Sequence, residues 1–105
     1  MSDSDSLQGM IDVDRLVHEP ARLVILTVLY VVESADFIFL LRETGLGKGN
    51  LSSHLTRLEQ AGYISIEKTY QGKRPMTLCR MTKTGRAAFE AYHEQLKNYV
   101  DSVNK

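Results

Sequence analysis

Residues 47–64 read GKGNLSSHLTRLEQAGYI, and this stretch decides the fold of the chain. Its leucines, Leu51, Leu55 and Leu58, are spaced by four and three residues, which places them on one face of a helix. The residues between them are mostly small or hydrogen-bonding. The pattern predicts a helix over 48–61, anchored by one leucine stripe, with Gly62 as its C-terminal stop. Its other side suits contact with polar groups, as reading a DNA groove requires.

The residues before this helix predict two further helices. Residues 20–33 are apolar on most sides and begin with Pro20, which fits the first position of a helix. We expect this segment to be buried in the core or in a subunit contact. Residues 37–44 form the next expected helix, and the Gly-Leu-Gly turn at 45–47 leads from it into the leucine-striped helix.

The N-terminal region and the segment between the first two helices carry weaker patterns. Residues 1–10 are rich in serine and aspartate and predict a disordered tail. Residues 11–18 predict a short helical lead-in. A break is expected at 34–36, where Ser34 or Asp36 would cap the following helix.

The residues after 62 predict a β-hairpin and a last helix. Residues 63–68 alternate with the period of a strand, 70–75 are rich in turn residues, and 76–81 form the return strand. Cys79 and Met81 should face inward, opposite Arg80. Thr82 is the expected cap of a helix that runs over 83–103.

The charge of the chain is unevenly distributed. Its 105 residues have a net charge of zero, with a composition ordinary for one globular domain. Residues 48–86 nevertheless hold eight basic and two acidic residues, a net charge of +6. Basic charge concentrated on one helix and hairpin indicates nucleic acid as a partner. The alternative is a solvated face that is basic without function.

The order of elements and four motifs resemble the winged helix-turn-helix domain in its MarR/ArsR-like regulator branch. The motifs are Gly-Asn-Leu-Ser-x-His-Leu at 49–55, Leu-Glu-x-Ala-Gly-Tyr-Ile at 58–64, Lys-x-x-x-Gly-Lys-Arg-Pro-x-Thr at 68–77 and Met-Thr-x-x-Gly at 81–85. Met81 departs from the leucine usual in that family. The resemblance covers residues 15 to 100.

The resemblance implies a mainly α fold with a small β-hairpin (α+β) and an extra C-terminal dimerisation helix. The domain would span 11–105. Its recognition helix would lie over 48–61 and its wing over 63–82, and the last helix would serve dimerisation.

The candidate DNA-binding residues lie on the outward side of the recognition helix and at the hairpin tip. They are Lys48, Asn50, Ser52, Ser53, Thr56, Arg57, Lys73 and Arg74. Asparagine pairs well with adenine and arginine with guanine or phosphate, and hydroxyls suit phosphate. The alternative for Asn50 and Ser52 is a capping role at the helix start. His54 is expected to be a hydrogen-bonded boundary residue, although the family pattern leaves a DNA contact open.

The last helix carries a heptad seam, with apolar residues at alternating steps of three and four. The expected dimer contacts along it are Phe89, Tyr92, Leu96, Tyr99, Val100 and Val103. The alternative is that this face, Phe89 and Tyr92 above all, packs on the core of its own domain. A two-fold dimer would place two recognition helices about 34 Å apart, one turn of DNA.

The sequence holds no pattern for catalysis, a metal site or a cofactor. Cys79 is the one cysteine, and His18, His54 and His93 lack the spacing of metal ligands. A basic-then-apolar leader and an apolar run of about 20 residues are both missing, so we expect a cytoplasmic protein outside the membrane.

We therefore expect a sequence-specific regulator that binds double-stranded DNA as a homodimer and is not an enzyme. A small-molecule effector stays open. The alternative is a winged-helix module that contacts proteins and does not bind DNA.

Overall fold

The computed structural model of the chain describes residues 14–104, and its elements follow the predicted order with one strand added. They are α2 Pro20–Val32, β1 Ser34–Asp36, α3 Phe37–Thr44, α4 Lys48–Gln60, β2 Ile64–Gln71, β3 Arg74–Met81 and α5 Lys83–Val103. The predicted tail at 1–10 lies outside the described residues. The predicted helical lead-in at 11–18 is wrong for its described part, because residues 15–17 form a turn. The Asp14 carboxylate closes this turn by accepting a hydrogen bond from the N–H of Leu16 at 2.9 Å.

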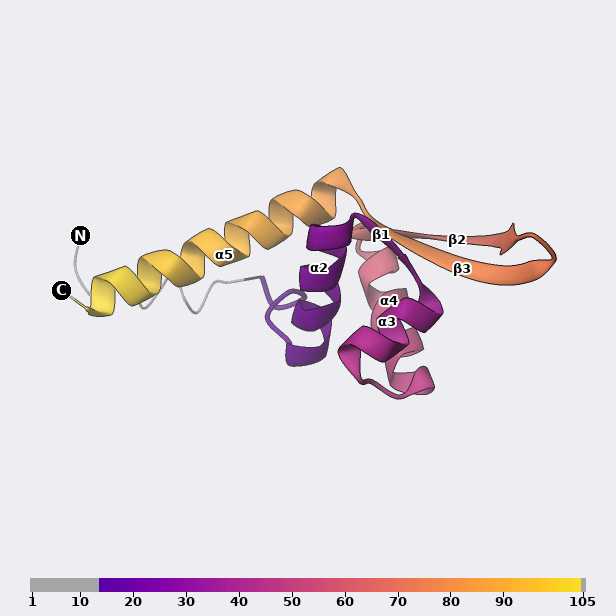
Figure 1. The fold of residues 1–105 in the computed structure, drawn as a ribbon. Helices are drawn as coiled ribbons and strands as arrows, with labels where there is room; N and C mark the ends of the chain where they lie inside the picture. The colour runs from indigo at the N-terminus through magenta and orange to yellow at the C-terminus, as the bar shows by residue number, and fades with distance from the viewer. Residues whose placement is uncertain (1–13, 105) are drawn as a thin grey trace.

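Helices α2, α3 and α4 form the body of the molecule, and two elements project from it (Figure 1). The β2–β3 hairpin extends to one side and α5 to the other, which gives the chain an elongated shape of 59 × 25 × 21 Å. At 1.5 Å per residue the 21 residues of α5 span about 31 Å, so its C-terminal half reaches well beyond the body.

Helix α4 is held by the leucine stripe that predicted it. Leu51 and Leu58 are fully buried and Leu55 nearly so. The helix ends at Gln60, one residue before the predicted end, and Gly62 adopts a φ of 81°, a conformation that L-residues rarely take. The predicted stop is confirmed, and the chain turns there into β2.

Helix α2 has one buried face and one exposed face, although its apolar composition predicts burial on most sides. Its buried face contributes Ile25, Leu26 and Leu29 to the core, while Val24 and Val31 stay exposed. Pro20 occupies the first helical position as predicted, and the Glu19 side chain caps the helix by accepting from the N–H groups of Ala21 and Arg22.

The sheet has three strands, whereas the sequence predicted a two-stranded hairpin. The predicted break at 34–36 is instead β1, which pairs antiparallel with β3 to give the order β1-β3-β2. Ala35 lies opposite Cys79, and both are buried. Three residues are too few to display a strand period, so the sequence could not reveal this strand. The predicted Asp36 cap is confirmed, since its carboxylate accepts from the N–H of Phe39 at 2.7 Å.

The hairpin is longer and its turn tighter than predicted. Gln71 pairs with Arg74, so the predicted turn region at 70–75 contracts to Gly72 and Lys73. Gly72 has a φ of 65° and Lys73 does not have a positive φ, which is the pattern of a two-residue type II′ turn. The tight turn carries the basic residues at the far end of a rigid ribbon.

Thr82 and Gly85 fasten the start of α5 to the turn after α4. The Thr82 hydroxyl caps α5 by accepting from the N–H of Gly85 at 3.0 Å and donates to the carbonyl oxygen of Gly62 at 2.6 Å. A Cβ atom added at Gly85 would lie 2.0 Å from the carbonyl oxygen of Tyr63. The Thr-x-x-Gly motif therefore permits a close contact between two backbone segments.

Replacing Gly85 with alanine is expected to destabilise the fold by about 3 kcal/mol, at the upper end of the usual cost of overpacking, because backbone must move. Gly49→Ala is the matched control, since a Cβ there meets no atom within 4 Å and alanine is the better helix former by about 1 kcal/mol. Urea denaturation of both variants measures the difference. Equal stability of the two would contradict the close contact.

Candidate nucleic-acid interface

The six predicted contact residues of α4 all lie on its exposed side. They are Lys48, Asn50, Ser52, Ser53, Thr56 and Arg57. The N-cap of the helix is Gly47, and no side chain caps it, so the alternative role of Asn50 and Ser52 as caps is wrong. Thr56 donates its hydroxyl hydrogen to the carbonyl oxygen of Ser52 at 3.0 Å, which leaves the lone pairs of its oxygen available.

These residues are divided between two flanks of α4. Each residue advances about 100° around a helix, so Ser52 and Thr56 lie on one side of the outward surface and Asn50 and Arg57 on the other. Ser52 and Thr56 face the hairpin, where they line a hollow together with Lys68 and Thr77. The sequence predicted the set of exposed residues, and the tertiary structure shows which of them face the wing.

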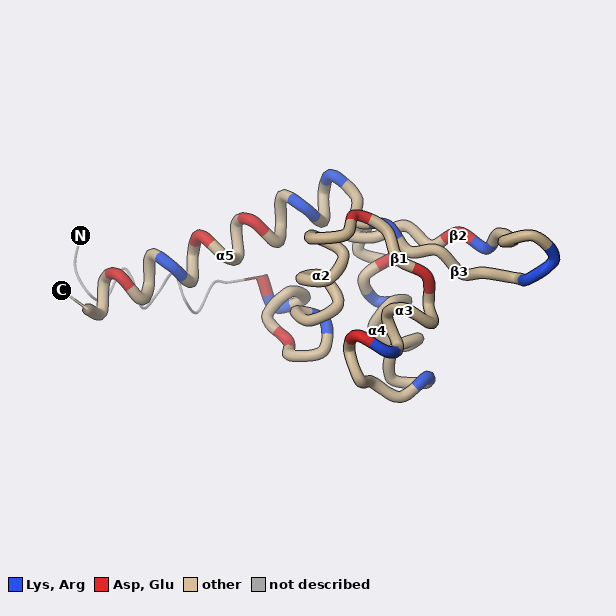
Figure 2. Tube along the Cα trace, viewed as in Figure 1, with Lys and Arg blue, Asp and Glu red and all other residues tan. Residues whose placement is uncertain are grey.

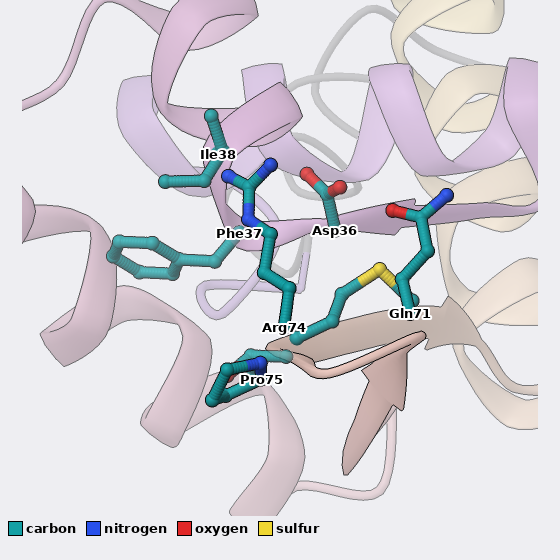
Figure 3. A pocket seen from close by; sticks show the side chains of 8 residues that line it. Asp36, Phe37, Ile38, Gln71, Arg74 and Pro75 are labelled. Carbon is teal, nitrogen blue, oxygen red and sulfur yellow. The ribbon is translucent and has the colours of Figure 1, made fainter.

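A second hollow continues the first along the hairpin. Both are lined by Phe37 and Thr77, so they form one concave surface between the helices and the wing. Figure 3 shows Arg74 extending from the hairpin toward Ile38 and Asp36 at the start of α3. Arg74 thus lies over the concave surface, while Lys73 occupies the turn at the end of the hairpin.

Basic residues lie at the far end of the hairpin and at the start of α4, whereas α5 carries both acidic and basic residues (Figure 2). Lys68 pairs with Thr77 and lines the concave surface. Arg80 is exposed beside the buried Cys79 and lies on the opposite face of the sheet from Cys79 and Thr77, as predicted. Tyr70 was missed as a candidate and is exposed beside the tip.

A buried cation behind α4 joins this helix to α2. Arg22 is 7% exposed; it donates from Nε to the carbonyl oxygen of Leu16 at 2.6 Å and from Nη1 to Nδ1 of His54 at 3.2 Å. The Glu19 carboxylate lies 3.8 Å from the guanidinium and 3.7 Å from His54. The predicted role of His54 as a hydrogen-bonded boundary residue is confirmed.

The electrostatics of this cluster favour an ionised Glu19. Partial burial acts to raise the pKa of Glu19, but hydrogen bonds from the backbone N–H groups of Arg22 and Ala21, with the nearby His54 and Arg22, lower it overall. Sequence reasoning missed Arg22, whose one signal was a charge inside an apolar run.

The predicted dimer residues of α5 fall into two groups. Tyr92 is 5% exposed and its hydroxyl hydrogen-bonds with Nδ1 of His18 at 2.8 Å, so it packs within its own chain, as the alternative held. Phe89 packs on Tyr30, with ring centroids 5.0 Å apart. Farther along, Val100 and Val103 are 47% and 61% exposed.

Cys79 is a core residue. Its side chain is fully buried as predicted, and burial, with the Glu59 and Asp36 carboxylates, raises the pKa of its thiol to about 11. Among residues 14–104, no three His, Cys, Asp or Glu side chains cluster to hold a metal ion, and no helix there is long and apolar enough to cross a membrane.

The described residues form four helices and a three-stranded antiparallel sheet with a projecting hairpin, and α4 keeps its polar side exposed. This arrangement defines the winged-helix class of proteins. The model of the winged helix DNA-binding domain family matches residues 21–100. An uncharacterized protein of Methanocaldococcus jannaschii is 33% identical over 78 residues, which cover 74% of this chain and 85% of that protein. The chain belongs to the winged helix DNA-binding domain family.

Solved structures share the whole architecture. The transcriptional regulator homologue protein from Pyrococcus horikoshii superposes with a TM-score of 0.87 at 26% identity, over 96% of this chain and 99% of that one. AbfR, in its overoxidized form bound to DNA, superposes with a TM-score of 0.69 over 90% of this chain and 65% of its own, and at 20% identity this likeness shows the fold alone. The predicted winged-helix fold is confirmed.

The Cys79 thiol is expected to resist modification in the folded protein. With a pKa of about 11, only on the order of one thiol in a thousand is ionised at pH 8, and the thiolate is the reactive form. A colourimetric disulfide reagent at pH 8 should react slowly with the native protein and rapidly in denaturant. Rapid reaction of the native protein would contradict burial of the thiol.

Proposed function

We propose that the chain is a transcription regulator that binds double-stranded DNA sequence-specifically as a homodimer. The observation that carries the proposal is the shared concave surface, where Ser52 and Thr56 of α4 face Lys68 of the wing. A helix with an exposed polar side beside a basic ribbon can contact a DNA groove and its flanking phosphates together. The DNA-bound relative AbfR supports this use of the fold.

In the proposed complex, α4 enters the major groove and its two flanks have different tasks. Asn50 and Arg57 carry side chains that pair bidentately with adenine and guanine, so they are the proposed base-reading residues. Ser52, Ser53 and Thr56 present hydroxyls, and Lys48 adds charge at the first turn, where helix N–H groups also favour phosphate. The division follows the chemistry of each side chain and its exposure.

The wing supplies sequence-independent affinity. Lys73 at the turn and Arg74 beside it are exposed, and they stand on a two-stranded ribbon that extends from the body (Figure 2). Cations on such a ribbon can contact phosphates or enter a narrow minor groove. The net charge of +6 over residues 48–86 makes this half of the chain the attractive one for DNA.

The homodimer is proposed from the C-terminal half of α5. Tyr99, Val100 and Val103 continue the seam along a helix that reaches beyond the body (Figure 1). Leu96, at the start of this stretch, is partly buried against the core of its own chain. Apolar side chains on a projecting helix gain stability when a second copy covers them. Two-fold pairing there would present two α4 helices to successive turns of a pseudo-palindromic site.

Replacing both Lys73 and Arg74 with alanine is expected to weaken binding to every duplex by a similar factor. It should also reduce the slope of log affinity against log salt by about 2, since each phosphate contact contributes about 0.9. Lys97→Ala, on the far part of α5, is the control and should leave the slope unchanged. Titrations of labelled duplex by fluorescence anisotropy at several salt concentrations measure the affinity and its salt slope. A native protein that binds no duplex at low salt would favour the protein-contact alternative.

Replacing Val100 and Val103 with glutamate is expected to convert the homodimer to monomer, because charge at a buried seam is costly. Gln95→Glu with Asn98→Glu adds the same charge to other faces of α5, where both residues are exposed, and should leave the dimer intact. Sedimentation equilibrium distinguishes the species. A native protein that sediments as a monomer would refute the dimer.

A further inference from the structure

The hydrogen bond between Arg22 and His54 determines which ring nitrogen of His54 carries the proton. Every nitrogen of a guanidinium donates and none accepts, so Nδ1 of His54, 3.2 Å from Nη1 of Arg22, is the acceptor. The Glu19 carboxylate is farther from Nδ1, at 3.7 Å, and already accepts from two backbone N–H groups. The neutral ring that satisfies this arrangement has its hydrogen on Nε2.

The Nε2 atom of His54 is accessible to solvent. Among the described residues, every buried side-chain nitrogen or oxygen has a hydrogen-bond partner. Nε2 of His54 has no partner among these residues, because the one hydrogen bond of the ring there is made by Nδ1. The atom is therefore reached by solvent, although the side chain as a whole is only 16% exposed. An N–H donor on Nε2 is thus accessible at the surface of α4.

This donor lies between the two proposed base-reading residues. Asn50, His54 and Arg57 follow one another at steps of four and three, so they form one stripe along the flank of α4 that faces away from the wing. A DNA groove occupied by Asn50 and Arg57 passes over His54 as well. The DNA atoms there, base-edge nitrogens and oxygens and phosphate oxygens, include many acceptors.

We propose that Nε2–H of His54 donates a hydrogen bond to an acceptor on DNA, and that Arg22 is the positioning residue that fixes this tautomer from behind the helix. The inference rests on the proposed DNA-binding function and adds a donor to its contact surface. It also gives a role to the buried Arg22 charge, which the packing of α2 alone does not require.

Substitution of His54 by asparagine or by glutamine provides the test, because each amide side chain can replace one of the two ring nitrogens. Asparagine places its oxygen near the position of Nδ1, so His54→Asn keeps the acceptor for Arg22 and loses the outer donor. Glutamine reaches the position of Nε2, so His54→Gln keeps the donor and loses the acceptor. A purely structural role for His54 would make DNA affinity follow stability in both variants.

We expect one variant to lose DNA affinity without losing stability, and the other to lose stability without losing DNA affinity. His54→Asn should unfold at the native urea concentration and bind duplex roughly five- to tenfold more weakly, the value of one hydrogen bond. His54→Gln should be less stable and bind within about twofold of native at 10 °C. A loss equal on all duplexes identifies a phosphate acceptor, and a loss confined to the selected site identifies a base.

Unchanged binding by His54→Asn, while Arg57→Ala weakens binding, would overturn the inference and leave the proposed function standing. A native protein that binds no duplex would overturn both. The tautomer is tested separately by nitrogen-15 chemical shifts of the imidazole rings, with His54→Asn used to assign the signal. The native ring should show hydrogen on Nε2 alone and the Arg22→Met ring a mixture of tautomers; native hydrogen on Nδ1 would also overturn the inference.

Discussion

Burial of the leucine stripe of α4 is the interaction on which the rest of the structure depends. Leu51, Leu55 and Leu58 lie in the core, and each contributes about 2 kcal/mol on removal from water. Because a helix has a fixed period, holding one side in the core commits the other side to solvent. The six polar side chains of α4 that are proposed as DNA contacts are exposed for this reason, and the direction in which α4 faces follows from the same contact. His54, at the edge of the stripe, is only partly exposed.

The second constraint is the junction where α4, the hairpin and α5 meet. Thr82 bonds both to Gly85 and to Gly62, and the missing side chain at Gly85 lets α5 begin against the Tyr63 backbone. This junction fixes the base of the wing relative to the C-terminal end of α4. It also directs α5 away from the body, on the side opposite the hairpin (Figure 1).

Much of the fold was predictable, because local signals determine it. The helix period, the caps at Asp36 and Thr82 and the stop at Gly62 each depend on a few neighbouring residues, and the structure confirms them. The exceptions depend on contacts distant in sequence. β1 exists because Ala35 meets Cys79, which the neighbours of Ala35 do not reveal. The sequence left both a dimer contact and core packing open for Tyr92, and its contact with the distant His18 decides for core packing.

The sequence by itself determined which residues of α4 are exposed and where basic charge gathers, because both follow from periodicity and composition. The tertiary structure alone decided that Ser52 and Thr56 face the wing and that Arg22 stands behind His54. The physical reason is that a helix period orders side chains around one axis, whereas only packing between elements sets where that axis points.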